Sequence, residues 1–357
     1  MNSISNFSFL SSLLSEWYKN NKRDLPWRNT TDPYLIWLSE IILQQTRVEQ
    51  GFPYYESILN RFPDVHKLAA ASLDELLKLW QGLGYYSRAR NMHTTARQVV
   101  NEFGGKFPIS YEGLLQLKGV GEYTAAAVAS FAYRIPKAVL DGNVFRVLAR
   151  LFDIDTPINT SMGKKLFSQI ANDLLDRKSP DIHNQAIMEF GAMQCTPTKP
   201  DCSRCPLSIH CLAYTNGKVQ NLPFKLAGVK KKNRFFHYFF MSDGKSTWIQ
   251  QRTQKDIWQQ LWEFPLIESR KEETLETLLC REDVTSWIGN NAQIDGCVSL
   301  KHILTHQIIH AKFVTVKIER KTGYPAYWKN IPISELDQYA VPKLMDNFII
   351  NHILLDL

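Results

Sequence analysis

Four cysteines lie close together in the second half of the chain, at Cys195, Cys202, Cys205 and Cys211. Thiolates at such short intervals can together enclose one metal centre. Zinc ribbons usually carry two Cys-x2-Cys pairs, whereas this segment carries one, and ligation by cysteine alone also suits an iron–sulfur cluster. The spacing therefore predicts a metal centre, with zinc as the alternative to iron and sulfur.

Two carboxylic acids stand in contrasting surroundings. Glu40 lies in the run YLIWLSEIILQQ, which is apolar nearly all round when wound into a helix. Burial there disfavours the ionised carboxylate and raises its pKa. Asp141 precedes an expected helix at residues 144–152, whose positive dipole end favours an ionised carboxylate, and Asn143 can cap that helix. A protonated acid paired with a carboxylate is the division of labour used to cleave glycosidic bonds.

The run Gly119-Val120-Gly121 separates two expected helices. Glycine permits a tight reversal, and a helix that opens on glycines presents unpaired backbone N–H groups to a phosphate. The alternative is a purely structural role, in which the run joins two helices as an αα-hairpin and Asp141 only caps the helix that follows.

Further residues suit contact with nucleic acid. Trp27-Arg28, and Tyr85 ahead of two arginines, place aromatic rings beside guanidinium groups, which can stack on bases. Gln44 and Gln45 can hydrogen-bond base edges or enter a base stack. Packed aromatic residues and exposed glutamines are the alternative interpretation.

The chain has 357 residues, of which 44% are hydrophobic and 22% are charged, and this composition is that of a globular protein. Residues 202–242 contain seven Lys and Arg and no acid, which equals the net charge of +7 of the whole chain. A basic stretch of this kind is either a solvated linker or a contact with a polyanion. No run is long enough for a membrane span and the start lacks signal-peptide features, so we expect a reducing, cytoplasmic location without disulfides.

The periodicity predicts a helical first part and a β-rich second part. We expect an all-α domain at residues 1–215, a basic linker at 216–233 and a second domain at 234–357. The expected helices are residues 7–19, 34–45, 48–59, 73–79, 88–103, 123–131, 144–152, 162–175, 184–193 and 342–354, and the expected strands are 235–241, 247–251 and 313–318.

These motifs together resemble the helix-hairpin-helix DNA glycosylases, and in particular the MutY-type adenine DNA glycosylases. The shared runs are Gly-Val-Gly, Leu-Asp-Gly-Asn-Val, Trp-Leu-Ser-Glu, Gln-Gln, Gly-Leu-Gly-Tyr-Tyr and the cysteine spacing. The resemblance is strong over residues 25–211 and looser over 234–357. It implies an α+β two-domain protein, with an all-α glycosylase domain bearing an iron–sulfur loop and a Nudix-like α/β domain.

The resemblance also implies an activity and its residues. A monomer would excise adenine paired with 8-oxoguanine or guanine from double-stranded DNA, and would hold one [4Fe–4S] cluster on the four cysteines. Glu40 would protonate the departing adenine and Asp141 would stabilise the sugar cation, with Asn143 and Tyr123 beside them. The residues implied in adenine or DNA binding are Trp27, Arg28, Leu43, Glu189, Gln44, Gln45, Tyr85, Gly119, Val120, Gly121, Thr305 and His306.

The main competitor is endonuclease III, which shares the hairpin and the cluster. That enzyme carries a lysine nucleophile where this chain has Tyr123, and a phenol cannot form a Schiff base. We therefore expect a monofunctional glycosylase. A lyase-competent relative of endonuclease III and a DNA-binding protein without chemistry remain the alternatives.

The second domain resembles a Nudix domain through Trp262-Glu263-Phe264-Pro265. Residues 268–283 lack the ordered glutamates that hold magnesium in Nudix hydrolases, so nucleotide hydrolysis is not expected. Leu304-Thr305-His306 corresponds to the family's Phe-Ser-His, the loop that senses 8-oxoguanine. Leu304 and Thr305 depart from that pattern, as Lys118 does from the family's proline.

Overall fold

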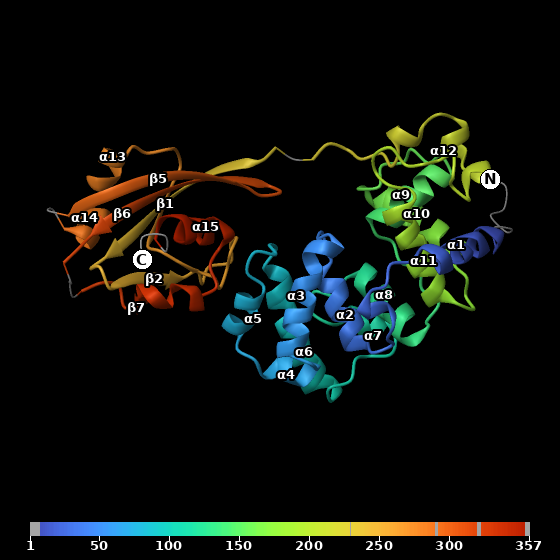
Figure 1. Ribbon diagram of the computed structural model, residues 1–357, viewed down its shortest axis with the longest axis horizontal. Coiled ribbons are helices and arrows are strands. Elements are labelled where there is room, and N and C mark those ends of the chain that lie inside the picture. Colours follow the sequence, from blue (N-terminus) through green and yellow to red (C-terminus); the bar gives the residue numbers. More distant parts are fainter. Residues whose placement is uncertain (1–7, 229, 290–291, 320–322, 354–357) are drawn as a thin grey trace. The chain divides into compact units, whose positions relative to one another are not determined.

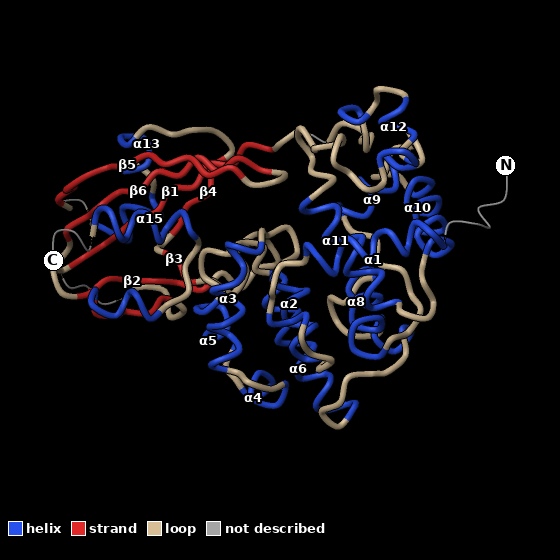
Figure 2. Tube along the Cα trace, turned by 45° about the vertical axis from the view of Figure 1, so that its right-hand side comes forward, coloured by secondary structure: helices blue, strands red, loops and turns tan. Residues whose placement is uncertain are grey.

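The computed structural model describes residues 8–228, 230–289, 292–319 and 323–353. The chain forms two compact units (Figure 1): Met1–Ala70 with Asn91–Ala227, and Ala71–Arg90 with Gly228–Leu357. The first unit is helical, and all strands of the described chain belong to the second (Figure 2).

The helices of the first unit surround a core built on α11. Helix α11 packs against α1, α8 and α9, and α2 packs against α8. The bounds are α1 Ser8–Asn21, α2 Pro33–Ile42, α3 Val48–Arg61, α4 Val65–Ala70, α6 Ser87–Phe103 (which begins in the second unit), α7 Tyr111–Leu115, α8 Glu122–Tyr133, α9 Gly142–Leu151, α10 Ser161–Leu174, α11 Pro180–Met193 and α12 Leu212–Thr215, with 3-10 turns η1 Pro26–Arg28, η2 Ser208–His210 and η3 Val219–Asn221.

Local sequence explains how α2 and α8 come together. Asp32 caps α2, because its carboxylate accepts a hydrogen bond from the backbone N–H of Tyr34 at 2.8 Å, and Pro33 occupies the first helical position. Helix α8 is buried from Thr124 to Phe131, including a run of alanines. These small side chains allow the two helix backbones to approach closely.

The second unit is built on one mixed seven-stranded sheet. Its main order is β3-β2-β1-β6-β5, with β4 paired to β1 and β7 to β2; β1 and β6 are parallel and the other pairs are antiparallel. The bounds are β1 Lys232–Ser242, β2 Ser246–Gln251, β3 Trp262–Glu263, β4 Leu266–Ser269, β5 Gln293–Ile303, β6 Gln307–Lys317 and β7 Trp328–Pro332, with α5 Leu73–Leu79, α13 Leu275–Leu279, α14 Glu282–Ile288, α15 Lys343–His352 and the 3-10 turn η4 Ile333–Gln338.

Apolar side chains cover both faces of this sheet. On one face Phe239 and Val314 pack with Leu278 of α13 and Val284 of α14. On the other, the ring of Phe313 stacks on Phe348 of α15 at 4.2 Å between centroids. Helices α13 and α15 accordingly lie on opposite sides of the sheet (Figures 1 and 2). A sheet with helices on both faces agrees with the expected α/β character of this part.

Several expected elements differ at their ends. The helix expected at 34–45 stops at Ile42, and Gln45 has a left-handed φ of 55°. The edge strand β5 was not expected. Residues 268–283 contain the short helix α13 and the start of α14 rather than one long glutamate-rich helix. Residues 7 and 354, which bound two expected helices, lie outside the described residues.

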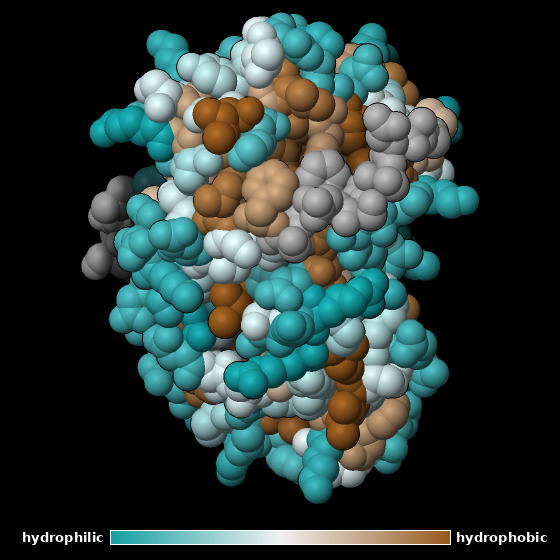
Figure 3. Space-filling view, turned by 90° about the vertical axis from the view of Figure 1, so that its right-hand side faces the viewer, coloured by the Kyte–Doolittle hydropathy of each residue, from teal (hydrophilic) through white to brown (hydrophobic). Residues whose placement is uncertain are grey.

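The surface at one end of the molecule is mainly hydrophilic, with several separate apolar groups (Figure 3). Within the described part of the chain, no helix combines the length and the apolar character that a membrane span needs.

Candidate functional site

A cavity of about 160 Å³ opens in the first unit. Elements far apart in the sequence line it: η1, α2, the start of α8, the start of α9, and α11. Residues that the sequence analysis selected and that lie on its wall are Trp27, Arg28, Glu40, Leu43, Tyr123, Asp141, Asn143 and Glu189. The cavity therefore brings together the two carboxylic acids and the four residues implied in adenine binding.

Glu40 is buried, with 8% of its surface exposed. Its Oε2 accepts a hydrogen bond from the Tyr123 hydroxyl at 2.5 Å. Burial raises the pKa of Glu40 to about 7; Asp141 adds to the rise, while Tyr123 and Arg28 oppose it. Glu40 is thus a carboxylic acid that holds a proton close to neutral pH, because water cannot solvate its anion.

Asp141 is the N-cap of α9. Its Oδ1 accepts from the backbone N–H of Val144 at 2.7 Å, and its Oδ2 accepts from Asn143 Nδ2 at 2.8 Å. The helix cap is therefore Asp141 itself, and not Asn143 as we expected; Asn143 instead holds the carboxylate.

The pKa of Asp141 is raised by burial, against the expectation of a carboxyl that ionises readily. The hydrogen bonds from Val144 and Asn143, and the charge of Arg146, act in the opposite direction. The N–H groups of Val144 and Asn143 donate to the carboxylate oxygens and stabilise the anion, but burial outweighs them and the net change of the pKa is upward. The expectation overlooked that a capping position can also be buried.

Glu189 is almost fully buried and is held by two arginines. Arg23 donates to it through Nε at 2.8 Å and Nη2 at 2.7 Å, and Arg28 through Nη1 at 2.9 Å and Nη2 at 2.5 Å. Burial acts to raise the pKa of Glu189, but the bonds from Arg23 and Arg28 outweigh it and lower the pKa to about 2. Arg23 was missed by the sequence analysis, because one cation among several polar residues carries no spacing signal.

The segment after α2 leads out of the cavity. Leu43 follows the last residue of α2 and lines the wall. Gln44 donates to the hydroxyl of Thr124 at 3.2 Å, and Gln45 is exposed. Both glutamines therefore lie in a turn, not at the end of a helix as expected.

The Gly-Val-Gly run forms the turn before α8. Gly119 has a φ of +75°, and a Cβ there would lie 2.6 Å from the Cβ of Asn91, so no other residue fits without displacement. Val120 is buried. Gly121 is the N-cap of α8 and has no side-chain cap. A Cβ at this position would have no atom within 4 Å. The first N–H groups of α8 are therefore accessible to an anion.

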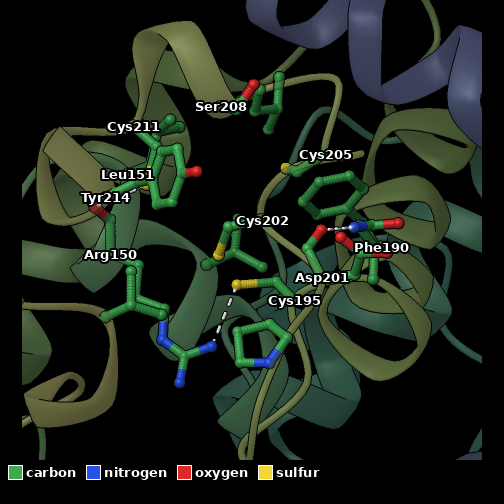
Figure 4. Close-up of a pocket in the computed structure, with 15 residues that line it drawn as sticks. Arg150, Leu151, Phe190, Cys195, Asp201, Cys202, Cys205, Ser208, Cys211 and Tyr214 are labelled. Atoms are coloured by element: carbon green, nitrogen blue, oxygen red, sulfur yellow. Dashed lines mark hydrogen bonds between the residues drawn. The ribbon is translucent and has the colours of Figure 1, made fainter. Parts of the chain in front are cut away.

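The four cysteines line a second cavity of the first unit, of about 30 Å³ (Figure 4). Arg150 lies beside it, with its Nη1 3.4 Å from Cys195 Sγ, and donates to the carbonyls of Thr196 and Pro197. Burial raises the pKa of Cys202, Cys205 and Cys211, that of Cys205 to about 11. Without a metal these thiols stay protonated, so metal binding would release protons.

Arg146 joins the two cavities of this unit. Its Nε donates to the carbonyl of Cys195 at 2.7 Å, and its Nη2 donates to Asn143 Oδ1 at 2.8 Å. Asn143 in turn bonds Asp141. One arginine thus connects the main chain at the first cysteine with the carboxylate of the larger cavity.

Thr305 and His306 lie in the exposed turn between β5 and β6. The turn is closed by a bond from the N–H of Leu304 to the carbonyl of Gln307 at 2.8 Å. The hydroxyls of Thr305 and Tyr85, both in the second unit, are 2.7 Å apart.

The basic stretch at residues 202–242 is partly neutralised. Arg204 pairs with Asp201, Lys218 with Asp153, and Arg234 with two carboxylates of the second unit. The remaining cations, Lys225, Lys230, Lys231 and Lys232, are exposed.

Comparisons with known proteins agree with this layout. Residues 38–172 match the HhH-GPD superfamily of base excision DNA repair proteins, and residues 237–351 match the NUDIX domain. The adenine DNA glycosylase of Buchnera aphidicola subsp. Acyrthosiphon pisum (strain APS) is 30% identical over 350 residues, which are 95% of this chain and 97% of that relative. That of Homo sapiens is 45% identical over 225 residues, 60% of this chain and 41% of the relative.

Two solved structures share the helical fold. A thermostable thymine-DNA glycosylase matches with a TM-score of 0.54 and 30% identity over 58% of this chain and 96% of its own. Endonuclease III, in a non-covalent complex with DNA, matches with a TM-score of 0.52 and 20% identity over 61% of this chain and 99% of its own. The expected α+β class, with a helix-hairpin-helix glycosylase unit and a Nudix-like domain, is confirmed, and the chain belongs to the adenine DNA glycosylase family.

Proposed function

We propose that this protein hydrolyses the N-glycosidic bond of adenine paired with 8-oxoguanine, or with guanine, in double-stranded DNA. The observation that carries the proposal is the shared cavity of Glu40 and Asp141, one a carboxyl with a pKa of about 7 and the other a carboxylate that accepts two hydrogen bonds. Cleavage of this bond needs a proton on the departing base and negative charge beside the sugar cation.

The roles follow from these surroundings. Glu40 donates its proton to a ring nitrogen of adenine, and Tyr123 orients the donor through its 2.5 Å hydrogen bond. Asp141, held by Asn143 and by the start of α9, stabilises the positive charge that develops on the sugar. Each group is in place before the substrate arrives, which reduces reorganisation during the reaction.

The remaining wall of the cavity suits a flipped-out purine. Trp27 and Leu43 offer apolar surface, and Trp27 is itself fixed by an edge contact with Tyr55 at 4.9 Å. Glu189 stays ionised between Arg23 and Arg28 and can accept from an amino group. An extruded adenine would place its π-face against Trp27 and Leu43 and its amino group beside Glu189.

DNA is held by both units in this proposal. The open N-terminus of α8 at Gly119, Val120 and Gly121 binds a backbone phosphate. Gln44, Gln45 and Tyr85 contact the duplex, and Thr305 and His306 face the base opposite the adenine. The protein acts as a monomer on a duplex with an adenine mispair.

We further propose that the four cysteines hold one [4Fe–4S] cluster. All four line one cavity and all are free thiols, a donor set that suits iron and sulfur. Zinc is the alternative metal, but zinc ribbons usually have two Cys-x2-Cys pairs, whereas this segment has one, at Cys202 and Cys205. When bound, the cluster supplies cross-links within residues 195–211, while the chain's own side chains perform the proton transfer.

A single-turnover assay tests the activity. Free adenine should appear from a duplex with adenine opposite 8-oxoguanine, without strand breakage until alkali is added. Release of no base from that duplex would contradict the proposal. A protein–DNA adduct trapped by borohydride would favour a lyase instead; the described wall of the cavity contains arginines but no lysine to form one.

The cluster has its own assay. Protein purified without oxygen should be yellow-brown and contain about four irons per chain, the count that defines a [4Fe–4S] centre. Cys202→Ser should lose that iron, whereas Cys297→Ser, at an exposed thiol of the second unit, should retain it. A colourless preparation with one zinc per chain would overturn the assignment.

A further inference from the structure

The second unit contains a partly buried cluster of ion pairs that the proposed reaction does not use. Arg234, on β1, donates five hydrogen bonds: to Glu268 through Nε and Nη2, each at 2.7 Å, to Asp256 through Nη1 at 2.9 Å and Nη2 at 2.7 Å, and to Gln307 through Nη1 at 3.1 Å. A guanidinium has five N–H donors, so every one has an acceptor.

A second arginine completes the cluster. Arg252 donates to Asp256 at 2.8 Å and to both oxygens of Glu263 at 2.9 Å. Both guanidinium groups also lie against the fully buried ring of Phe236, at 4.8 and 5.4 Å from its centroid. Asp256 is therefore held between two arginines that are themselves fixed by an aromatic ring.

The cluster holds the loop between β2 and β3 in a strained form. Trp258 and Gln260, which are not glycines, have φ angles of 58° and 66°. Non-glycine residues adopt this left-handed region only where the surroundings impose it. Here Asp256 is fixed by the arginines, and Arg252 also donates to the carbonyl of Ile257 at 3.2 Å.

Two contacts transmit this order to the β5–β6 turn. Trp258 packs against His302, near the end of β5, with 5.9 Å between ring centroids. At the other side of the turn, Arg234 bonds the side chain of Gln307, the first residue of β6. The turn at residues 304–306 is thus fixed from both strands that it joins.

We propose that Arg234 is a positioning residue for discrimination of the base opposite the adenine. It acts through Gln307 and through the β2–β3 loop, and fixes where Thr305 and His306 stand. This inference rests on the proposed function for the identity of the base that is sensed. A lysine cannot replace the arginine, because an ammonium has three donors and cannot form the two forked carboxylate pairs.

The test uses the full-length, metal-loaded protein with Arg234→Lys and Gln307→Met. Gln307→Met keeps the length of the side chain and removes only the bond between cluster and turn, so it remains informative if Arg234→Lys folds poorly. Arg281→Lys is the matched control, because Arg281 also joins two carboxylates in this unit, Glu273 and Asp283, without contact to the turn.

The first readout is hydrogen exchange of the backbone amides of Leu304 and Lys232, which bond Gln307 and His306 across the base of the turn. Exchange should accelerate about tenfold in both variants, the effect of one lost, partly buried hydrogen bond, and stay unchanged in Arg281→Lys. Unchanged exchange in both variants would overturn the proposal, whatever the catalytic activity.

The second readout is the ratio of single-turnover rates for adenine opposite 8-oxoguanine and opposite guanine. This ratio should fall about fivefold or more, while the rate on the guanine duplex stays within about twofold. If the ratio falls as much in Arg281→Lys as in Arg234→Lys and Gln307→Met, the proposal is also overturned. If the unaltered protein releases no adenine, the proposed function fails, and the exchange data still decide whether Arg234 positions the turn.

Discussion

At Glu40 the chain buries a carboxylic acid and leaves it one hydrogen bond, from Tyr123. A proton donor is most effective when its pKa lies near the working pH, and burial raises that of Glu40 to about 7. The single-turnover rate should therefore be highest below pH 7 and fall about tenfold per pH unit above it, as the anion replaces the acid.

The substitution Glu40→Gln removes the proton donor and keeps the shape. Excision should fall by a factor of about 10² to 10⁴, the usual contribution of general acid catalysis, and the residual rate should no longer decrease above pH 7. Rates measured between pH 5.5 and 9 check both statements. A variant with the unaltered rate and pH profile would exclude Glu40 as the donor.

The same residue makes stability depend on pH. The folded pKa of about 7 lies above the ordinary value of 4.5, so the folded state is favoured by protonation. This contribution is complete below about pH 4.5 and is lost as the pH rises through 7.

Glu40→Gln has no proton to lose, so its stability relative to the unaltered protein should increase by about 3 kcal/mol between pH 4.5 and 8. Urea unfolding at several pH values measures this difference. Glu189→Gln is a contrasting control, because the pKa of Glu189 is lowered to about 2 and its ion pairs with Arg23 and Arg28 stabilise the fold at neutral pH.

At the scale of elements, the two glycines of the hairpin have separable tasks. Gly119 needs a positive φ and has no room for a Cβ, whereas Gly121 has an ordinary φ of −91° and open space. The first is thus required by the fold, and the second leaves the start of α8 free for a ligand.

Gly119→Ala should therefore lower the free energy of unfolding by about 2 kcal/mol, through strain and the clash with Asn91. Gly121→Ala should change it by less than about 0.5 kcal/mol, yet lower the slope of log K against log salt for DNA binding by about 1, as for one lost phosphate contact. Anisotropy titrations at several salt concentrations measure the slope. Unaltered DNA binding by Gly121→Ala would place the phosphate elsewhere.

The periodicity of the sequence identified the long helices well, because a buried apolar stripe recurs every three to four residues. It missed β5, whose exposed and half-buried residues alternate strictly but include none that is fully buried, so the apolar pattern of this strand is weaker than that of a core strand. It also placed Glu40 and Asp141 in a common site only by resemblance. Asp141 begins α9, and the packing of α2 on α8 and of α8 and α9 on α11 is not encoded in local spacing. The Arg23–Glu189 pair escaped it for the same reason.

At the scale of the whole molecule, the two units are interleaved along the chain. Residues 71–90 belong to the second unit, although the first unit continues on both sides of them. Gln81 bonds Asp346 at 2.9 Å and the N–H of Val341 at 3.1 Å, and Lys78 bonds the carbonyl of Tyr339 at 3.4 Å. Sequence order suggested a simple succession of domains, which such long-range contacts do not follow.

A truncated chain that ends at residue 227 should therefore lose ordered structure at residues 71–90 and keep it in the first unit. The amides of α5 should exchange about tenfold faster or more, since they lose their partners in the second unit. The buried amides of α8 should keep their protection. Hydrogen exchange followed by mass spectrometry resolves the two segments, and unchanged protection of α5 would show that the first unit alone supports it.

This interleaving has a consequence during translation. Gln81 leaves the ribosome about 265 residues before Asp346 does, and at roughly 5–20 residues per second that interval lasts on the order of 10 to 50 s. Through that interval the nascent segment at 71–90 is present without its final neighbours. During translation, therefore, either a chaperone binds residues 71–90, or the first unit folds while these residues still lack their partners in the second unit.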